Sequence, residues 1–168
     1  AELGNLSKLE RLNLSTNRLT GSIPPELGKL SKLQHLYIDS AQISGSIPPE
    51  LGNLAGLHEL HLAHNQLSGG IPPELGGLSA LEWLDLSFNG LDGDIPAELS
   101  SLSTLHYLYL NNNQLSGSVP QEMGSLVGLQ TLSIGDNGFG GSVPLTLIGL
   151  SQLALFNFAN TNLCEPND

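Results

Sequence analysis

Leucine residues recur along the chain with a period of 24 residues. One series is Leu6, Leu30, Leu54, Leu78, Leu102, Leu126 and Leu150, and a second is Leu9, Leu33, Leu57, Leu81, Leu105, Leu129 and Leu153. A period of this size predicts a stack of similar coils, in which each coil buries its apolar side chains against the next. Positions that repeat are therefore required for packing, whereas positions that vary are free to carry function.

Each unit also contains two apolar residues spaced two positions apart, as Leu12 and Leu14 are in the first unit. A period of two indicates a short β-strand. The equivalents of Leu12 are Leu36, Leu60, Leu84, Leu108, Leu132 and Phe156, and those of Leu14 are Ile38, Leu62, Leu86, Leu110, Ile134 and Phe158. We expect these strands to pair side by side in parallel, with both phenylalanines in core positions of the last coil.

An asparagine follows the strand in most units. The series is Asn17, Asn65, Asn89, Asn113 and Asn137. A buried amide at this position can bond the backbone groups of the turn that leaves the strand, which would otherwise lack partners. Ala41 interrupts the series, and we expect a local defect there.

A glycine, a proline and a glutamate complete the repeat, as Gly21, Pro24 and Glu26 do in the first unit. A proline followed by an acid suits the first turn of a short helix, often a 3₁₀ helix in so small a segment. We interpret the glutamates as a solvated row near the helix N-termini on the convex side. The alternative is a row that binds cations.

The pattern LxxLxxLxLxxNxLxGxIPxxLGxL, complete in residues 54–78, resembles the plant-type leucine-rich repeat. This repeat occurs in the ectodomains of plant receptor-like kinases and in polygalacturonase-inhibiting proteins, and similar repeats occur in bacterial secreted proteins. The resemblance implies an α/β solenoid. It would be a right-handed arc of seven 24-residue repeats, with a parallel concave sheet, short 3₁₀ helices on the convex side and a second short strand around Gly21 to Ile23.

The resemblance also implies one domain over residues 1–168, with 151–168 as a C-terminal capping repeat, and an extracellular or cell-surface location. Residues 1–4 match residues 25–28, so we expect the N-terminal cap to be missing and the chain to be a fragment or a trimmed product. No signal peptide and no apolar run long enough for a membrane span are visible in the sequence.

Charge is distributed very unevenly along the chain, whose formal net charge is −11. All five cationic residues lie in its first 32 residues: Lys8, Arg11, Arg18, Lys29 and Lys32. Nucleic acids and anionic membranes are therefore excluded as partners, because phosphate binding needs cations. A partner with a basic surface fits the charge. Some receptors of the resembled family hold a peptide carboxylate with an arginine pair, and this mode does not carry over because no arginine follows Arg18.

Aromatic residues with polar atoms are concentrated at four of the 24 repeat positions, all in or beside the predicted concave strands. These positions contain all five histidines, all three tyrosines and the one tryptophan. Such side chains are typical of binding hot spots. The candidate ligand-binding residues are Tyr37, His35, Glu59, His61, Trp83, Asp85, Tyr107, Tyr109, His64 and Phe88. The alternative is that neighbouring parallel strands simply favour aromatic side chains.

Four of these candidates, His35, Glu59, His61 and Asp85, have the spacing that could bring two or three ligands to a zinc or similar ion. Ordinary hydrogen bonding between strands is the interpretation we favour for them. We expect no cofactor. Because histidine changes charge near neutral pH, we also expect partner binding to depend on pH.

Catalysis is not expected, because an open sheet offers no site that excludes water or stabilises an oxyanion. Ser87, Asp85 and His61 are the residues nearest to a catalytic set. The sequence therefore predicts a recognition module for a protein or peptide. Two alternatives stay open: a passive structural array that self-associates through the uncapped N-terminal face, and a metal-binding surface.

Overall fold

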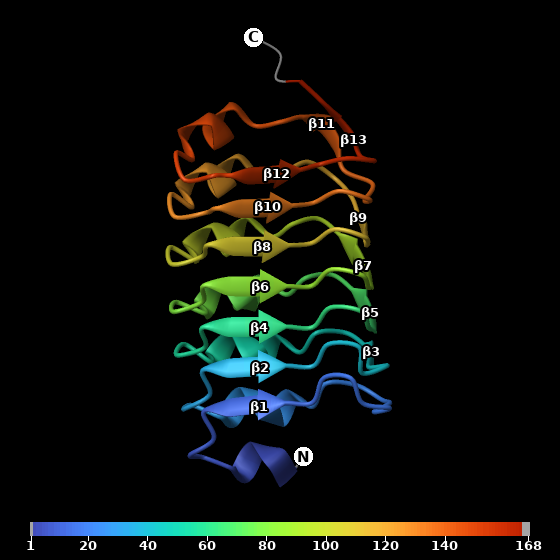
Figure 1. Cartoon of the computed structure of the whole chain (residues 1–168), viewed down its shortest axis with the longest axis vertical. Helices are drawn as coiled ribbons and strands as arrows, with labels where there is room; N and C mark the ends of the chain where they lie inside the picture. The colour runs from blue at the N-terminus through green and yellow to red at the C-terminus, as the bar shows by residue number, and fades with distance from the viewer. Residues whose placement is uncertain (1, 166–168) are drawn as a thin grey trace.

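The computed structural model describes residues 2–165, which form a stack of seven coils (Figure 1). Each coil contributes one strand to a parallel sheet with the order β1-β2-β4-β6-β8-β10-β12. The strands are β1 (Arg11–Asn13), β2 (His35–Tyr37), β4 (Glu59–His61), β6 (Trp83–Asp85), β8 (Tyr107–Tyr109), β10 (Thr131–Ser133) and β12 (Leu155–Asn157). Equivalent residues of successive coils lie opposite each other, as Leu12 and Leu36 do. The predicted α/β solenoid with seven 24-residue units is confirmed.

Short 3₁₀ helices occupy the side opposite this sheet, as predicted. They are η1 (Glu2–Asn5), η2 (Pro25–Lys29), η3 (Pro49–Asn53), η4 (Pro73–Gly77), η5 (Ala97–Ser101), η6 (Gln121–Ser125) and η7 (Leu145–Gly149). None of the described helices has the length and apolar character that a membrane crossing requires.

A second set of strands runs along one flank of the stack (Figure 1). Four of them, β3 (Ser44–Gly45), β5 (Gln66–Gly69), β7 (Gly90–Gly93) and β9 (Gln114–Leu115), form one sheet, and β11 (Gly140–Ser142) pairs with β13 (Asn162–Cys164). These strands begin up to three residues earlier in the repeat than expected. The first coil has no strand at Gly21 to Ile23.

The core is a column of aliphatic side chains between the main sheet and the helices. Leu60, Leu84 and Leu108 are fully buried, as the repeat predicts. The core assignment of Phe158 was wrong, since 40% of this residue is exposed. Phe156 is partly buried against the core. No described coil covers the far side of the last coil, which leaves Phe158 without the neighbour that its equivalents have.

The asparagine ladder is confirmed at Asn65, Asn89, Asn113 and Asn137, where each amide also joins its coil to the preceding one. Asn17 in the first coil is exposed and bonds only within its own turn. The Asn65 Nδ2 atom donates to the carbonyl oxygens of Leu62 (3.1 Å) in its own turn and Ile38 (2.6 Å) one coil earlier. Its Oδ1 atom accepts from the backbone N–H groups of Ala41 (3.1 Å) and Ile43 (3.0 Å). One side chain thus satisfies backbone groups in two coils.

The defect expected at Ala41 is present and affects the next residue. Gln42 has a φ of 57°, in the left-handed region, whereas its equivalents in the other described coils have no positive φ. Ala41 has no side-chain amide to hold the turn, so the backbone follows a different path there. The left-handed conformation costs a residue with a Cβ atom about 1–2 kcal/mol.

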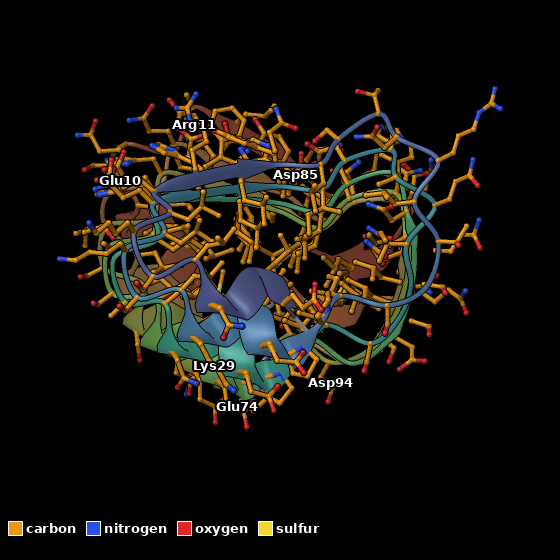
Figure 2. The ribbon with its side chains drawn as sticks, turned by 90° about the horizontal axis from the view of Figure 1, so that it is seen from below. Glu10, Arg11, Lys29, Glu74, Asp85 and Asp94 are labelled. Atoms are coloured by element: carbon orange, nitrogen blue, oxygen red, sulfur yellow. The ribbon has the colours of Figure 1, made fainter. Side chains whose placement is uncertain are left out.

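Close backbone contact between the helices is a constraint that the sequence analysis did not identify. A Cβ atom added to Gly28 would lie 2.2 Å from the Glu50 carbonyl oxygen, and one added to Gly52 would lie 2.1 Å from that of Glu74. Glycine at this helix position, which also occurs as Gly4, Gly76 and Gly124, therefore lets these helices rest directly on the next one, whereas η5 carries Ser100 there. The end-on view in Figure 2 shows the helices stacked behind one another, with Glu74 at their outer edge.

Glycine substitution at one repeat position should have opposite effects in two coils. Gln42→Gly should raise the free energy of unfolding by about 0.5–1 kcal/mol, because glycine relieves the left-handed conformation. Gln66→Gly, at the equivalent position in strand β5, should lower it by a similar amount, because glycine there only adds freedom to the unfolded chain. Urea titration of both variants checks the prediction, and a loss of stability in both would contradict it.

Candidate functional site

The concave face consists of the side chains that project outward from the seven-stranded sheet. Figure 2 shows Arg11 and Asp85 on this side and Lys29 on the opposite, helical side. Strands β2, β4, β6 and β8 carry eight of the predicted site residues in adjacent positions, and all eight are half-buried. They are His35, Tyr37, Glu59, His61, Trp83, Asp85, Tyr107 and Tyr109.

Glu59 is the centre of a polar cluster that joins two strands. The Tyr37 hydroxyl donates a hydrogen bond to Glu59 Oε2 at 2.6 Å. His35 Nδ1 lies 3.6 Å from Glu59 Oε1, and His61 Nε2 lies 3.5 Å from Oε2. The strand register explains this arrangement, because His35 is directly opposite Glu59 and Tyr37 is directly opposite His61.

Two buried nitrogen atoms of the site have no hydrogen-bond partner, namely Trp83 Nε1 and His61 Nε2. The 3.5 Å approach of His61 Nε2 to Glu59 is an ion-pair distance that fails as a hydrogen bond, so we regard it as a contact that acts when His61 is protonated. Unpaired buried polar groups cost folding free energy, and packing requirements do not explain them. Both atoms belong to the same face of adjacent strands.

The aromatic rings form a continuous run across four strands. The Trp83 ring centroid lies 5.3 Å from that of His61, 4.4 Å from that of Tyr107 and 5.6 Å from that of Tyr109. His61 in turn lies 5.0 Å from Tyr37. Trp83 therefore contacts residues of both neighbouring strands, β4 and β8, and links the two halves of the run.

His64 and Phe88 form a separate pair at the exit of the strands. Their rings stack with a centroid distance of 4.2 Å and an interplanar angle of 13°. Both residues have a positive φ, as does every residue at this repeat position: Thr16 (54°), Ser40 (52°), His64 (54°), Phe88 (53°), Asn112 (56°), Asp136 (52°) and Asn160 (56°). The asparagines and the aspartate at this position, which tolerate a left-handed conformation, were the available sequence signal.

Asp85 does not join the Glu59 cluster. Its Oδ1 atom accepts hydrogen bonds from the backbone N–H (3.0 Å) and the hydroxyl (2.6 Å) of Ser87, which fixes the turn after β6. In the described residues, no group of three or more His, Cys, Asp or Glu side chains is arranged to hold a metal ion. The structure therefore brings His35, Glu59 and His61 together at ion-pair distances, with Tyr37 hydrogen-bonded to Glu59, and leaves Asp85 apart.

Burial alters the acid–base properties of two groups near the site. Desolvation, together with the hydrogen bond to Glu59, raises the pKa of Tyr37 to about 12. Desolvation also raises the pKa of Asp39, against the opposing hydrogen bond from the Ala63 backbone N–H at 2.9 Å. Asp39 also lies 3.4 Å from the Ser15 hydroxyl, so it joins adjacent coils and has a structural role.

The chain matches the family model for the Leucine Rich Repeat over residues 8–30, 32–54, 56–78, 80–102 and 104–126. A comparison with curated protein sequences found no match.

Several solved structures are similar to this chain. The leucine-rich repeat ectodomain of the receptor kinase GASSHO1/SCHENGEN3 from Arabidopsis thaliana, in complex with CASPARIAN STRIP INTEGRITY FACTOR 2, is 42% identical with a TM-score of 0.94 over 96% of this chain and 19% of that chain. The plant peptide hormone receptor RGFR1, in complex with RGF2, is 35% identical with a TM-score of 0.95. The match covers 96% of this chain and 26% of the receptor chain. A plant ice-binding protein is 32% identical with a TM-score of 0.80, and the match covers 89% of this chain and 56% of that protein. The chain thus spans no more than 26% of either receptor chain.

The raised pKa of Tyr37 makes stability sensitive to high pH. Between pH 10 and about 12, the unfolded chain loses a proton that folded Tyr37 keeps, so the stabilisation present below pH 10 should decline across this interval. Tyr37→Phe should remove this decline. Absorbance titration of both proteins, with circular dichroism to follow folding, checks the prediction. A phase near pH 10 that disappears in Tyr37→Phe while the protein stays folded would contradict it.

Proposed function

Because the chain belongs to the leucine-rich repeat family, with repeats of the plant type, we propose that it is a non-catalytic recognition module that binds a protein or peptide on its concave face. The observation that carries the proposal is the continuous run of half-buried rings from Tyr37 to Tyr109, with Glu59 at one end of it. Rigid aromatic side chains with polar atoms supply contact area at a low cost in conformational entropy.

The partner in this proposal has a basic surface. The net charge is −11, and the concave face carries Glu59, Glu82 and Asp85 in the part of the chain that has no lysine or arginine. The negative electrostatic potential of this face attracts a cationic partner and accelerates its association. The similar peptide hormone receptor was solved with RGF2, and the similar receptor kinase ectodomain was solved with CASPARIAN STRIP INTEGRITY FACTOR 2. Both support a protein or peptide as partner and an extracellular or cell-surface location.

A passive array that self-associates is the alternative. At the N-terminal end of the stack, Leu3, Leu6 and Leu19 are 38%, 48% and 39% exposed. Exposed apolar side chains favour association between copies. This surface is separate from the aromatic run, so substitutions on the concave face distinguish the two functions.

Removal of two central rings should abolish capture of the partner. In the variant with Trp83→Ala and Tyr107→Ala, each lost side chain should cost about 2 kcal/mol of binding free energy, which lowers affinity well over a hundredfold. The protein is immobilised as bait with extract from its native source, and captured proteins are identified and then titrated individually.

The matched control carries Glu98→Ala and Glu122→Ala, two exposed residues on helices of the same region of the stack. It should capture the same partner with unchanged affinity. Equal capture by both double variants would refute binding at the concave face. If self-association were the function, the ring variant would instead assemble with the same concentration dependence as the unaltered chain.

Binding should weaken as the pH falls from 8 to 5. Histidine is the residue type that changes charge most readily near neutral pH. His35 and His61 both lie against Glu59, so any positive charge that they gain would offset the negative charge that attracts a basic partner. The variant with His35→Gln and His61→Gln should bind with much less dependence on pH. A dissociation constant of the unaltered chain that stays constant across the range would disprove the idea.

A further inference from the structure

The concave face contains one internal example of how it binds a cation. The Arg11 guanidinium carbon lies 5.7 Å from the centroid of the Tyr37 ring. The hydroxyl of the same tyrosine donates to the carboxylate of Glu59. An aromatic face next to a carboxylate thus accepts a guanidinium group at the N-terminal end of the aromatic run.

Aromatic rings and a carboxylate also lie on neighbouring strands further along the run, without an internal cation. Trp83 and Tyr109 lie with ring centroids 5.6 Å apart, and Asp85 is directly opposite Tyr109 in the strand register. No lysine or arginine follows Lys32 in the sequence. Within residues 2–165, the Arg11–Tyr37 contact is the only cation–π contact.

Asp85 has an oxygen atom available for a ligand. Its Oδ1 atom accepts both hydrogen bonds from Ser87, and no described residue donates a hydrogen bond to its Oδ2 atom. The side chain is half-buried, so a charge pair formed there is less screened than one on an open surface. Trp83, two residues earlier in β6, and Tyr109 in β8 provide the adjacent rings.

We propose that the ligand of the concave face presents an arginine side chain to Trp83, Asp85 and Tyr109, where it repeats the contact that Arg11 makes with Tyr37. The inference rests on the proposed function and specifies its ligand. A guanidinium group fits better than an ammonium group, because it is planar, stacks on aromatic rings and donates in a fork to a carboxylate. The partner is thus a protein or peptide with an accessible arginine.

Trp83 is the only tryptophan of the chain, so its fluorescence reports on this site directly. The intact chain is titrated at constant ionic strength with N-acetyl-arginine amide, N-acetyl-lysine amide and N-acetyl-citrulline amide, which is a neutral analogue of the arginine amide. We expect a saturable change with the arginine amide and a dissociation constant on the order of millimolar. The lysine amide should bind about three- to tenfold more weakly, and the citrulline amide should not bind.

Two variants test the position of the site. Asp85→Asn keeps an oxygen for the Ser87 hydrogen bonds and removes the charge, and Tyr109→Leu removes the ring. Each should weaken arginine binding about three- to tenfold. Glu122→Gln, which removes a charge from helix η6, is the control and should have no effect.

The inference is overturned if the arginine amide does not bind, or if the lysine amide or the citrulline amide binds as tightly as the arginine amide. It is also overturned if both site variants bind the arginine amide like the control variant. Any of these results, combined with loss of partner capture by the Trp83 and Tyr107 double variant, would leave the proposed function standing and remove only the arginine site. If the double variant captures the partner normally, the proposed function itself fails.

Discussion

The stacking of each coil on the next in fixed register is the constraint on which the whole structure depends. Because the coil length is constant, Leu60 falls opposite Leu36 and Leu84, and the Asn65 amide reaches backbone groups of the coil before it. On the helical side, Gly52 allows its helix to touch the Glu74 carbonyl oxygen. One inserted residue would break the sheet register, the amide ladder and this helix contact together, which explains why the period shows no slippage.

Most of the scaffold could be predicted from the sequence because stacking repeats the same requirement in every coil. A packing or hydrogen-bonding requirement that recurs in every coil selects the same residue type at the same repeat position. Ala41 was recognisable as a gap because it interrupts the asparagine series. The form of the defect, a left-handed Gln42, was not predictable, because it depends on how the backbone closes without the amide. Phe158 was misassigned since its burial depends on a neighbouring coil and not on its own position in the repeat.

The candidate site was predictable in composition but not in geometry. Position in the repeat decides which side chains face outward, and it correctly grouped those of strands β2, β4, β6 and β8. The contacts among them depend on side-chain rotamers, which no period encodes. Trp83 contacts both neighbouring strands, and Glu59 collects Tyr37 and the two histidines, whereas Asp85 turns to Ser87. Residues at equivalent repeat positions therefore make different side-chain contacts in the structure.

The sixth coil provides an internal comparison that separates folding from recognition. Its outward residues Thr131 and Ser133 are small, are only 8% and 5% exposed, and continue the sheet without large rings. Stacking therefore does not demand aromatic residues at these positions. Two coils earlier, Trp83 packs on the rings of both neighbouring strands and leaves its buried ring nitrogen without a hydrogen-bond partner among the described residues. The rings of the second to fifth coils are therefore a property of this part of the stack and not a requirement of stacking, and this is the distribution that the proposed recognition function needs.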